Sequence, residues 1–242
     1  MKTKKNSRSK EVGKMLLAVL ALLIVASTSF SCDAQRNKGH KTARKAKTER
    51  NENVKVKTVG AAISSTEWEP NAPATVAFNE FPSTLDEWKE MQKLLGGEPQ
   101  GAVALQVMAF ELYRNNRTDG EAALRLNNTN TNYNSTVERL REIMGKDVYY
   151  ARPYIARAML RGATPENGYT VRPPYYIDMK VDPNKRYQES QLLKGTVIYL
   201  LVDSKGWDTN WRGVEVVKPA GSDYYVVSNC PAMYTQCKQA KQ

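Results

Sequence analysis

The sequence predicts an α+β domain in which about five N-terminal helices pack on one face of a C-terminal antiparallel sheet of about four strands. Two patterns predict this fold. From about Phe81 to Arg161, apolar residues recur every three or four positions, as they do on one face of a helix. After residues 162–170 they recur in short runs rich in Val, Ile and Tyr, as they do in antiparallel strands. Helices followed by strands favour two layers, with the helices on one side of the sheet.

Residues 1–31 are expected to be a bacterial-style signal peptide. A basic stretch with six Lys or Arg residues precedes the twelve-residue apolar run Met15–Ala26, and small polar residues follow it. As a helix, a twelve-residue run rises about 18 Å, whereas the hydrocarbon core of a bilayer is roughly 30 Å thick. The run is therefore expected to direct export and not to stay in the membrane as a permanent span.

The residues after the apolar run resemble a lipoprotein signal. In such signals signal peptidase II cuts before a diacylglyceryl-modified cysteine, and here Ser29-Phe30-Ser31 precedes Cys32. Ser31 supplies the small residue before the cysteine, although Ser29 stands where an aliphatic side chain is usual and Phe30 is bulky. We expect lipidation of Cys32, which makes the membrane a partner through the lipid anchor. The alternative is a signal peptidase I cut after Ala34, which leaves a soluble mature chain.

Residues 32–58 are expected to form a flexible tether, because they are polar, basic and nearly free of large apolar groups. Their nine Lys or Arg residues against three acids could attract anionic lipid, but a solvated spacer is the favoured interpretation. Residues 59–80 are expected to be an extended lead-in with room for one edge strand. Residues 59–242 hold 21 basic and 21 acidic residues, so the net charge of +11 belongs to the preceding segments, and nucleic acid is not an expected partner.

The single α+β domain is expected to cover residues 81–242 and to begin with an amphipathic helix. Ser83 starts a pattern like a capping box, and Gly96 ends the helix. Pro99 suits the first turn of a second helix. This helix is apolar nearly all round as far as Tyr113, so it is expected to be the buried central helix.

Three further helices are expected before the strands begin. They are predicted at residues 119–126, from Ser135 to Gly145, and at about 152–161. Residues 127–134 interrupt them with a run rich in asparagine, which competes for its own backbone and favours turns. An exposed connector is favoured there over a binding loop.

Residues 162–170 are expected to be the corner where the helices meet the strands. Pro165 presets φ for a turn, and Asn167-Gly168 accepts positive φ. The strands after the corner are expected at Tyr175–Val181, Thr196–Val202, Val214–Lys218 and Asp223–Val227.

The two cysteines beyond the predicted signal, Cys230 and Cys237, are expected to form a disulfide. With Cys32 lipidated the remaining count is even, and an exported protein folds in an oxidising compartment. Free thiols and a metal site are the alternatives. A metal is not expected, because the only histidine is His40, in the tether, and two cysteines do not complete a zinc site. No phosphate-binding or dinucleotide-binding motif occurs, so no cofactor is expected.

Two segments carry a resemblance to a known family. The first is Gly162-Ala163-Thr164-Pro165-Glu166-Asn167-Gly168-Tyr169-Thr170 with Pro174-Tyr175 after it, and the second is Ser204–Arg212, with Gly206 and Asp208. With them the sequence resembles an uncharacterised family of bacterial proteins with a domain of unknown function, over roughly Phe81 to Val227. The second segment is one residue longer than the family pattern, and the loop closed by Cys230 and Cys237 departs from it. The resemblance implies the fold but no activity, because none is established for the family.

The same two segments hold the candidate polar site. Glu166 and Asn167 lie in the corner, and Asp208 and Arg212 follow the second long strand. A carboxylate beside a guanidinium binds anionic or sugar-like ligands, and two carboxylates can act as acid and base on a glycosidic bond. The favoured interpretation is structural, in which Glu166 and Asn167 shape a turn while Asp208 and Arg212 form a pair that holds a loop.

Two functions from different classes remain. The first is a non-enzymatic, lipid-anchored cell-envelope protein, facing the periplasm or the cell surface, that binds an envelope protein or a small ligand. The alternative is a hydrolase that acts on glycan or cell-wall material through Glu166 and Asp208. Ser-His and Cys-His nucleophiles are excluded, because the domain contains no histidine. Four aromatic residues are candidates for a carbohydrate platform or for the outer face of a sheet: Trp207, Trp211, Tyr224 and Tyr225.

Overall fold

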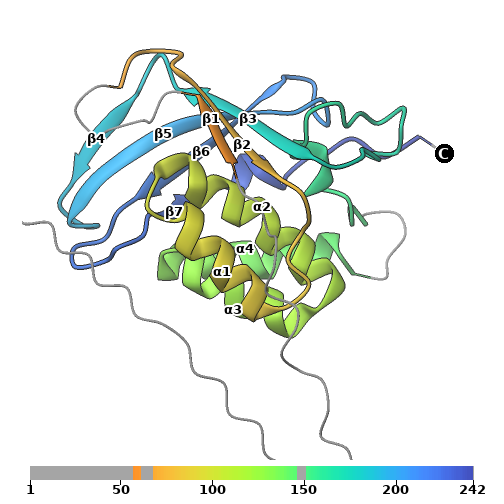
Figure 1. The fold of residues 1–242 in the computed structure, drawn as a ribbon, viewed down its shortest axis with the longest axis horizontal. Helices are drawn as coiled ribbons and strands as arrows, with labels where there is room; N and C mark the ends of the chain where they lie inside the picture. The colour runs from red at the N-terminus through yellow and green to blue at the C-terminus, as the bar shows by residue number, and fades with distance from the viewer. Residues whose placement is uncertain (1–56, 61–67, 146–150, 242) are drawn as a thin grey trace, which may run out of the picture. The chain divides into compact units, whose positions relative to one another are not determined.

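The computed structural model describes residues 57–60, 68–145 and 151–241. Within them, four α-helices lie on one side of a seven-stranded sheet (Figure 1). The helices are α1 (Leu85–Leu95), α2 (Pro99–Asn115), α3 (Arg117–Asn127) and α4 (Asn130–Ile143). The strands are β1 (Lys57–Gly60), β2 (Pro73–Phe78), β3 (Tyr175–Val181), β4 (Tyr187–Ser190), β5 (Gly195–Asp203), β6 (Trp211–Val217) and β7 (Val226–Asn229). The α+β class is confirmed.

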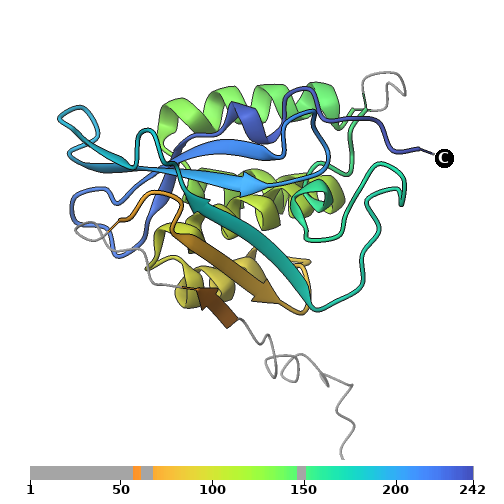
Figure 2. The ribbon, with the colours of Figure 1, turned by 90° about the horizontal axis from the view of Figure 1, so that it is seen from above.

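The sheet is antiparallel throughout, in the order β1-β2-β3-β5-β6-β7. Strand β5 pairs with β3 over residues 200–202 and with β4 over residues 195–198, so β3 and β4 share one edge of β5. Figure 2 shows the strands from above, lying across the helices. The four strands predicted after the corner all occur. The sheet is larger than predicted because β4 joins it and because β1 and β2 come from residues before the helices.

Strand β2 corrects the expectation of one edge strand in the lead-in. It lies between β1 and β3, and its alternate residues Ala74, Val76 and Phe78 are buried in the core. Strand β1, which begins at Lys57 within the expected tether, forms the edge. The lead-in pairs with β3 because its alternating apolar residues match the period of a strand with one buried face.

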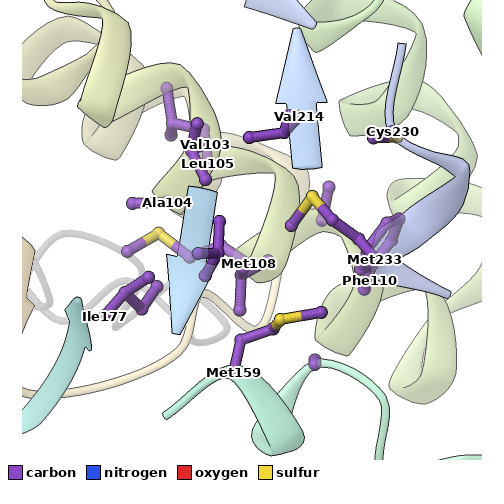
Figure 3. Close-up of a cluster of buried hydrophobic side chains, with 14 of the residues drawn as sticks. Val103, Ala104, Leu105, Met108, Phe110, Met159, Ile177, Val214, Cys230 and Met233 are labelled. Atoms are coloured by element: carbon purple, nitrogen blue, oxygen red, sulfur yellow. The ribbon is translucent and has the colours of Figure 1, made fainter. Parts of the chain in front are cut away.

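Helix α2 is the centre of the helical layer, as predicted. All of its residues from Pro99 to Tyr113 are buried, and it contacts α1, α3 and three strands, β2, β6 and β7. The core between α2 and the sheet gathers side chains from helix and strands alike (Figure 3). Members shown there include Leu105, Met108, Phe110, Met159, Ile177 and Val214. This continuous core joins the helical half and the strand half into one folding unit.

The prediction of a fifth helix at about residues 152–161 is wrong. Residues 152–161 form turns and one short 3-10 helix, η1 (Arg157–Met159). Pro153 lacks a backbone donor, and Arg161 donates its backbone N–H to Tyr176 O at 2.8 Å. The segment therefore ends in a hydrogen bond to β3 and not in a further helical turn.

The expected exposed loop at residues 127–134 is also wrong, because α3 leads almost directly into α4 and the asparagines there are buried. Asn127 and Asn128 both donate to Gln106 Oε1, at 3.0 and 2.9 Å, and Asn132 donates to Asn128 Oδ1. Buried amides are tolerated when they satisfy one another, so this cluster ties the α3–α4 junction to α2.

The predicted disulfide is absent, because Cys230 and Cys237 are both free, buried thiols. The sulfur of Cys230 accepts hydrogen bonds from Gln106 Nε2 at 3.5 Å and Asn132 Nδ2 at 3.4 Å. The sulfur of Cys237 lies 3.9 Å from the Tyr169 hydroxyl oxygen. Burial raises the pKa of each thiol to about 11. Each sulfur thus occupies its own packed environment, one against the helices and the other against the corner.

Among the helices that the structure describes, none combines the length and the apolar character needed to cross a bilayer. The predicted signal peptide, the lipidation residue Cys32 and nearly all of the tether lie outside the described residues.

Candidate functional site

The two motif segments meet the C-terminal tail, residues 238–241, at one open pocket of about 700 Å³. Figures 1 and 2 both show the blue tail beside the green-to-teal corner. The pocket is lined by Thr164, Pro165 and Glu166 of the corner, by Lys205, Trp207, Asp208 and Asn210 of the β5–β6 loop, and by Lys238, Gln239 and Lys241 of the tail. The structure therefore brings Glu166 and Asp208 to one pocket, whereas Asn167 and Arg212 are not part of its lining.

Asn167 shapes the corner, as the structural interpretation predicted. Its side-chain amide accepts from the backbone N–H of Thr164 at 2.9 Å and donates to Gly162 O at 2.8 Å. Gly162 and Gly168 both adopt positive φ, which is why glycine suits these two turn positions. Asn167 thus holds the turn closed, and the turn presents Glu166 to the pocket.

The corner also binds the tail through its backbone. Pro165 O accepts from the backbone N–H of Lys241 at 2.8 Å. The buried Tyr169 donates its hydroxyl to Lys238 O at 2.9 Å, and its ring stacks on Tyr154 at a centroid distance of 4.7 Å. Burial is the main reason that the pKa of Tyr169 is raised, so this hydroxyl remains a donor. The tail is therefore a wall of the pocket held by specific hydrogen bonds.

The β5–β6 loop is held just as tightly. Gly206 O accepts from the backbone N–H of Lys238 at 2.7 Å, and a Cβ at Gly206 would lie 3.1 Å from Ala158 Cβ and 3.3 Å from Cys237 Sγ. Trp207 is buried, and its indole N–H donates to Thr235 O. The close approach at Gly206 explains why glycine suits this position, and it lets the loop, the corner and the tail meet.

Every carboxylate that lines the pocket is paired with a lysine of the tail. Lys241 Nζ lies 2.9 Å from Glu166 Oε1, and Lys238 Nζ lies 3.1 Å from Asp208 Oδ1. The hydrogen bond from Lys241 is the main cause that lowers the pKa of Glu166. Both pairs are solvent-exposed, so each contributes little to stability and can open readily.

Arg212 is placed differently from the prediction. Asp208 pairs with Lys238, and no ion pair joins it to Arg212 within the described residues. The guanidinium of Arg212 instead lies over the Trp207 ring, with Cζ 5.4 Å from the ring centroid. Its Nε is buried and has no hydrogen-bond partner among the described residues, and burial lowers the pKa of the side chain. The loop is thus held by backbone bonds and packing, without the predicted pair.

A family model described as Domain of unknown function (DUF6935) matches residues 80–241, which is more than half of the chain. The chain belongs to this family. The matched range includes the corner, the β5–β6 loop and the tail, so the whole pocket lies within the family domain. Neither a curated protein nor a solved structure gave a significant match.

The predicted aromatic platform is not a single surface of the family domain. Trp207 is buried in the pocket wall, whereas Trp211 lies on the side of the sheet away from the helices, where Lys180 Nζ sits 4.4 Å from its ring centroid. Tyr225 donates its backbone N–H to Gly96 O, beside the end of α1. Within the described residues, no three His, Cys, Asp or Glu side chains gather as a metal site would require.

Sequence reasoning missed the lysines that line the pocket. Lys205, Lys238 and Lys241 stand among other charged and polar residues, without a local spacing that marks a site. Their importance arises from contacts across the chain: Lys241 meets a corner residue 75 positions earlier. From the sequence alone, any Lys or Arg of the domain could be the partner of Glu166, and nothing in the sequence favours Lys241 over the others.

Proposed function

We propose that the protein is exported, anchored in a membrane of the cell envelope by lipidated Cys32, and that its family domain is a non-enzymatic binding module. The domain faces the periplasm or the cell surface at the end of a polar, basic tether. It binds a small polar ligand, or an exposed polar group of an envelope protein, in the pocket between corner, loop and tail. The order of signal, Cys32, polar tether and neutral domain in the sequence supports the location.

One observation carries the binding assignment: three segments distant in sequence converge on a single open pocket, and each contributes charged side chains to it. Concave sites with a few convergent polar groups are where small ligands bind in most proteins. The backbone bonds from Pro165, Tyr169 and Gly206 to the tail hold the walls in place, so the pocket is formed before a ligand arrives.

A hydrolase is the second candidate, because Glu166 and Asp208 do line the same pocket. The pairing with lysine weakens this candidate. A carboxyl group that acts as a general acid needs a raised pKa, and Lys241 lowers the pKa of Glu166. In addition, Asp208 is exposed and paired with Lys238. The binding module is therefore the function that we adopt.

The location is tested by replacing the lipidation residue. In the native host, Cys32→Ala is expected to move the protein from the membrane fraction to the soluble envelope fraction and to abolish labelling by a fatty-acid probe. Ser31→Ala keeps a small residue before the cysteine and serves as the matched control, which should stay at the membrane and keep its label. Membrane retention of Cys32→Ala, or a chain that remains in the cytosol, would contradict the proposal.

The binding site is tested by filling the pocket. Asn210 is exposed and lines the pocket, so Asn210→Trp is expected to block ligands from an envelope extract without disturbing the core. Asn184→Trp places the same ring at an exposed turn outside the pocket and is the matched control. The measurement is co-purification of envelope glycans and small molecules with the full-length chain, analysed by mass spectrometry. Equal capture by both variants would exclude the pocket as the binding site.

A further inference from the structure

We infer that the pocket takes an anionic oxygen group, a carboxylate or a phosphate, and that Arg212 supplies the charge that selects it. This inference rests on the proposed function, because it assumes that the pocket is the ligand site. It adds the chemical class of the ligand and gives a role to Arg212, which lies behind Trp207 and outside the pocket lining.

The pocket's own ion pairs are easily replaced. Lys238 and Lys241 are balanced by Asp208 and Glu166, whose side chains are 96% and 62% exposed. Exposed pairs of this kind contribute little, because water and salt screen them. An incoming anion can therefore take the place of either carboxylate beside the two lysines, while the displaced carboxylate turns to solvent.

Arg212 is the surplus charge of this region. Asp203 pairs with Lys205 at 3.5 Å, so three carboxylates balance the three lysines of the pocket. Arg212 has no such partner: among the described residues it forms neither an ion pair nor a hydrogen bond, and its Nε is buried. An unbalanced positive charge in a half-buried position favours an anion nearby, because burial disfavours the charged form and lowers the pKa of Arg212.

Trp207 connects this charge to the pocket. Trp207 lines the pocket, and its indole ring lies against the Arg212 guanidinium, with Cζ 5.4 Å from the ring centroid, so a single residue separates the unbalanced charge from the pocket. The indole N–H already donates to Thr235 O, so the Trp207 side chain has no further donor for a ligand. The ligand is therefore recognised by the lysines of the pocket and by Arg212, whose positive charges favour an anionic group over a neutral hydroxyl.

The test uses two matched pairs of probes on the full-length chain in mild detergent: galacturonate with galactose, and glucose 6-phosphate with glucose. Binding is followed by the NMR signals of the Trp207 indole N–H and the Gln239 backbone N–H. We expect the anionic member of at least one pair to shift both signals and its neutral partner to shift neither. Binding should weaken as NaCl rises from about 0.05 M to about 0.5 M. Whichever anionic probe binds identifies the carboxylate or the phosphate as the group recognised.

Variants separate the role of Arg212 from a general loss of structure. Arg212→Gln should weaken binding of the anionic probe about three- to tenfold, and Arg212→Lys should restore most of it, because a charge across one ring acts at intermediate dielectric. Lys238→Gln should weaken binding as well. Lys93→Gln removes an exposed, paired lysine of α1, outside the pocket, and should change nothing.

Two results would overturn the inference. One is equal shifts from a neutral sugar and its anionic partner, with no effect of Arg212→Gln; the pocket would then bind ligands without regard to charge, and the proposed function would stand. The other is no shift from either anionic probe at any salt concentration. The proposed function itself fails only if filling the pocket with Asn210→Trp leaves capture from the envelope extract unchanged.

Discussion

Removal of one hydroxyl, by Tyr169→Phe, should release the C-terminal tail. Tyr169 is buried at the corner, and its hydroxyl donates to Lys238 O at 2.9 Å. The substitution keeps the aromatic ring and its stacking on Tyr154, and it removes the bond to the tail together with the longer contact of 3.9 Å from the Cys237 sulfur. Because this bond joins the corner to a wall of the pocket, its loss should lower the free energy of unfolding and make the tail less ordered.

The magnitude follows from the surroundings of the bond. A typical intramolecular hydrogen bond contributes about 1 kcal/mol net, and a buried partner left without a donor costs about 1–3 kcal/mol. The bond is only partly buried, so the upper part of that range does not apply. We therefore expect Tyr169→Phe to lower the free energy of unfolding by about 1–2 kcal/mol.

The assay is urea unfolding of the full-length chain combined with a double-mutant cycle. A chain ending at Cys237 lacks Lys238, so in that background Tyr169→Phe should cost almost nothing, and the coupling energy should be about 1 kcal/mol. Tyr187→Phe, at an exposed position of β4, is the control and should stay within about 0.5 kcal/mol of the parent. A coupling energy of zero, or an equal loss in both backgrounds, would refute the view that this hydroxyl holds the tail.

Two further predictions concern the core. Gly101→Ala should destabilise the domain by about 3 kcal/mol in urea unfolding, because the new Cβ would lie 1.8 Å from Leu95 O, whereas Gly97→Ala meets no atom within 4 Å and should be neutral. Cys230 and Cys237 should resist a thiol reagent until the chain unfolds, because both are buried. Since their folded pKa of about 11 exceeds the ordinary thiol pKa of 9.0, stability should be full below about pH 9 and fall as pH rises towards 11. Rapid labelling of the folded chain, or a flat stability profile there, would contradict this.

The helices and strands that the sequence predicted correctly are those with a strong local period. Helix α2 is apolar on nearly all sides in the sequence, and every residue from Pro99 to Tyr113 is buried in the fold. The strand predicted at Tyr175–Val181 has the bounds of β3. Such elements bury one face or all faces, so the spacing of their apolar residues along the sequence matches the period of a strand or a helix.

The two errors in the helical half have a common cause. Asn127, Asn128 and Asn132 favour turns when considered alone, yet in the fold the side-chain N–H groups of the first two donate to Gln106 and that of the third donates to Asn128. Asn132 and Thr136 are spaced four apart, which is a sequence signal that they share one face of α4. Conversely, residues 152–161 contain apolar residues at helical spacing, but they form turns and one short 3-10 helix, and the last of them, Arg161, donates its backbone N–H to β3.

The candidate site was predicted in part. Turn chemistry identified the corner, so the positions of Glu166 and Asn167 followed from residue type. The structure added the ion pairs of Glu166 and Asp208 with the tail, the stacking of Arg212 on Trp207 and the separation of the two thiols. Residue type alone could not predict these contacts, because each of the residues could pair with many others in the chain.

The sequence by itself determined the class of the domain, the central helix, the corner and the expectation of an export signal, because these depend on the order and period of residues within one short segment. Only the tertiary structure decided that the tail closes a pocket against the corner, and that Arg212 lies over the Trp207 ring without an ion pair to any carboxylate of the described residues. The physical reason is that charged and polar contacts between distant segments are weak individually. Their partners are selected by where the packing of the core places the segments, and not by the residues' own preferences.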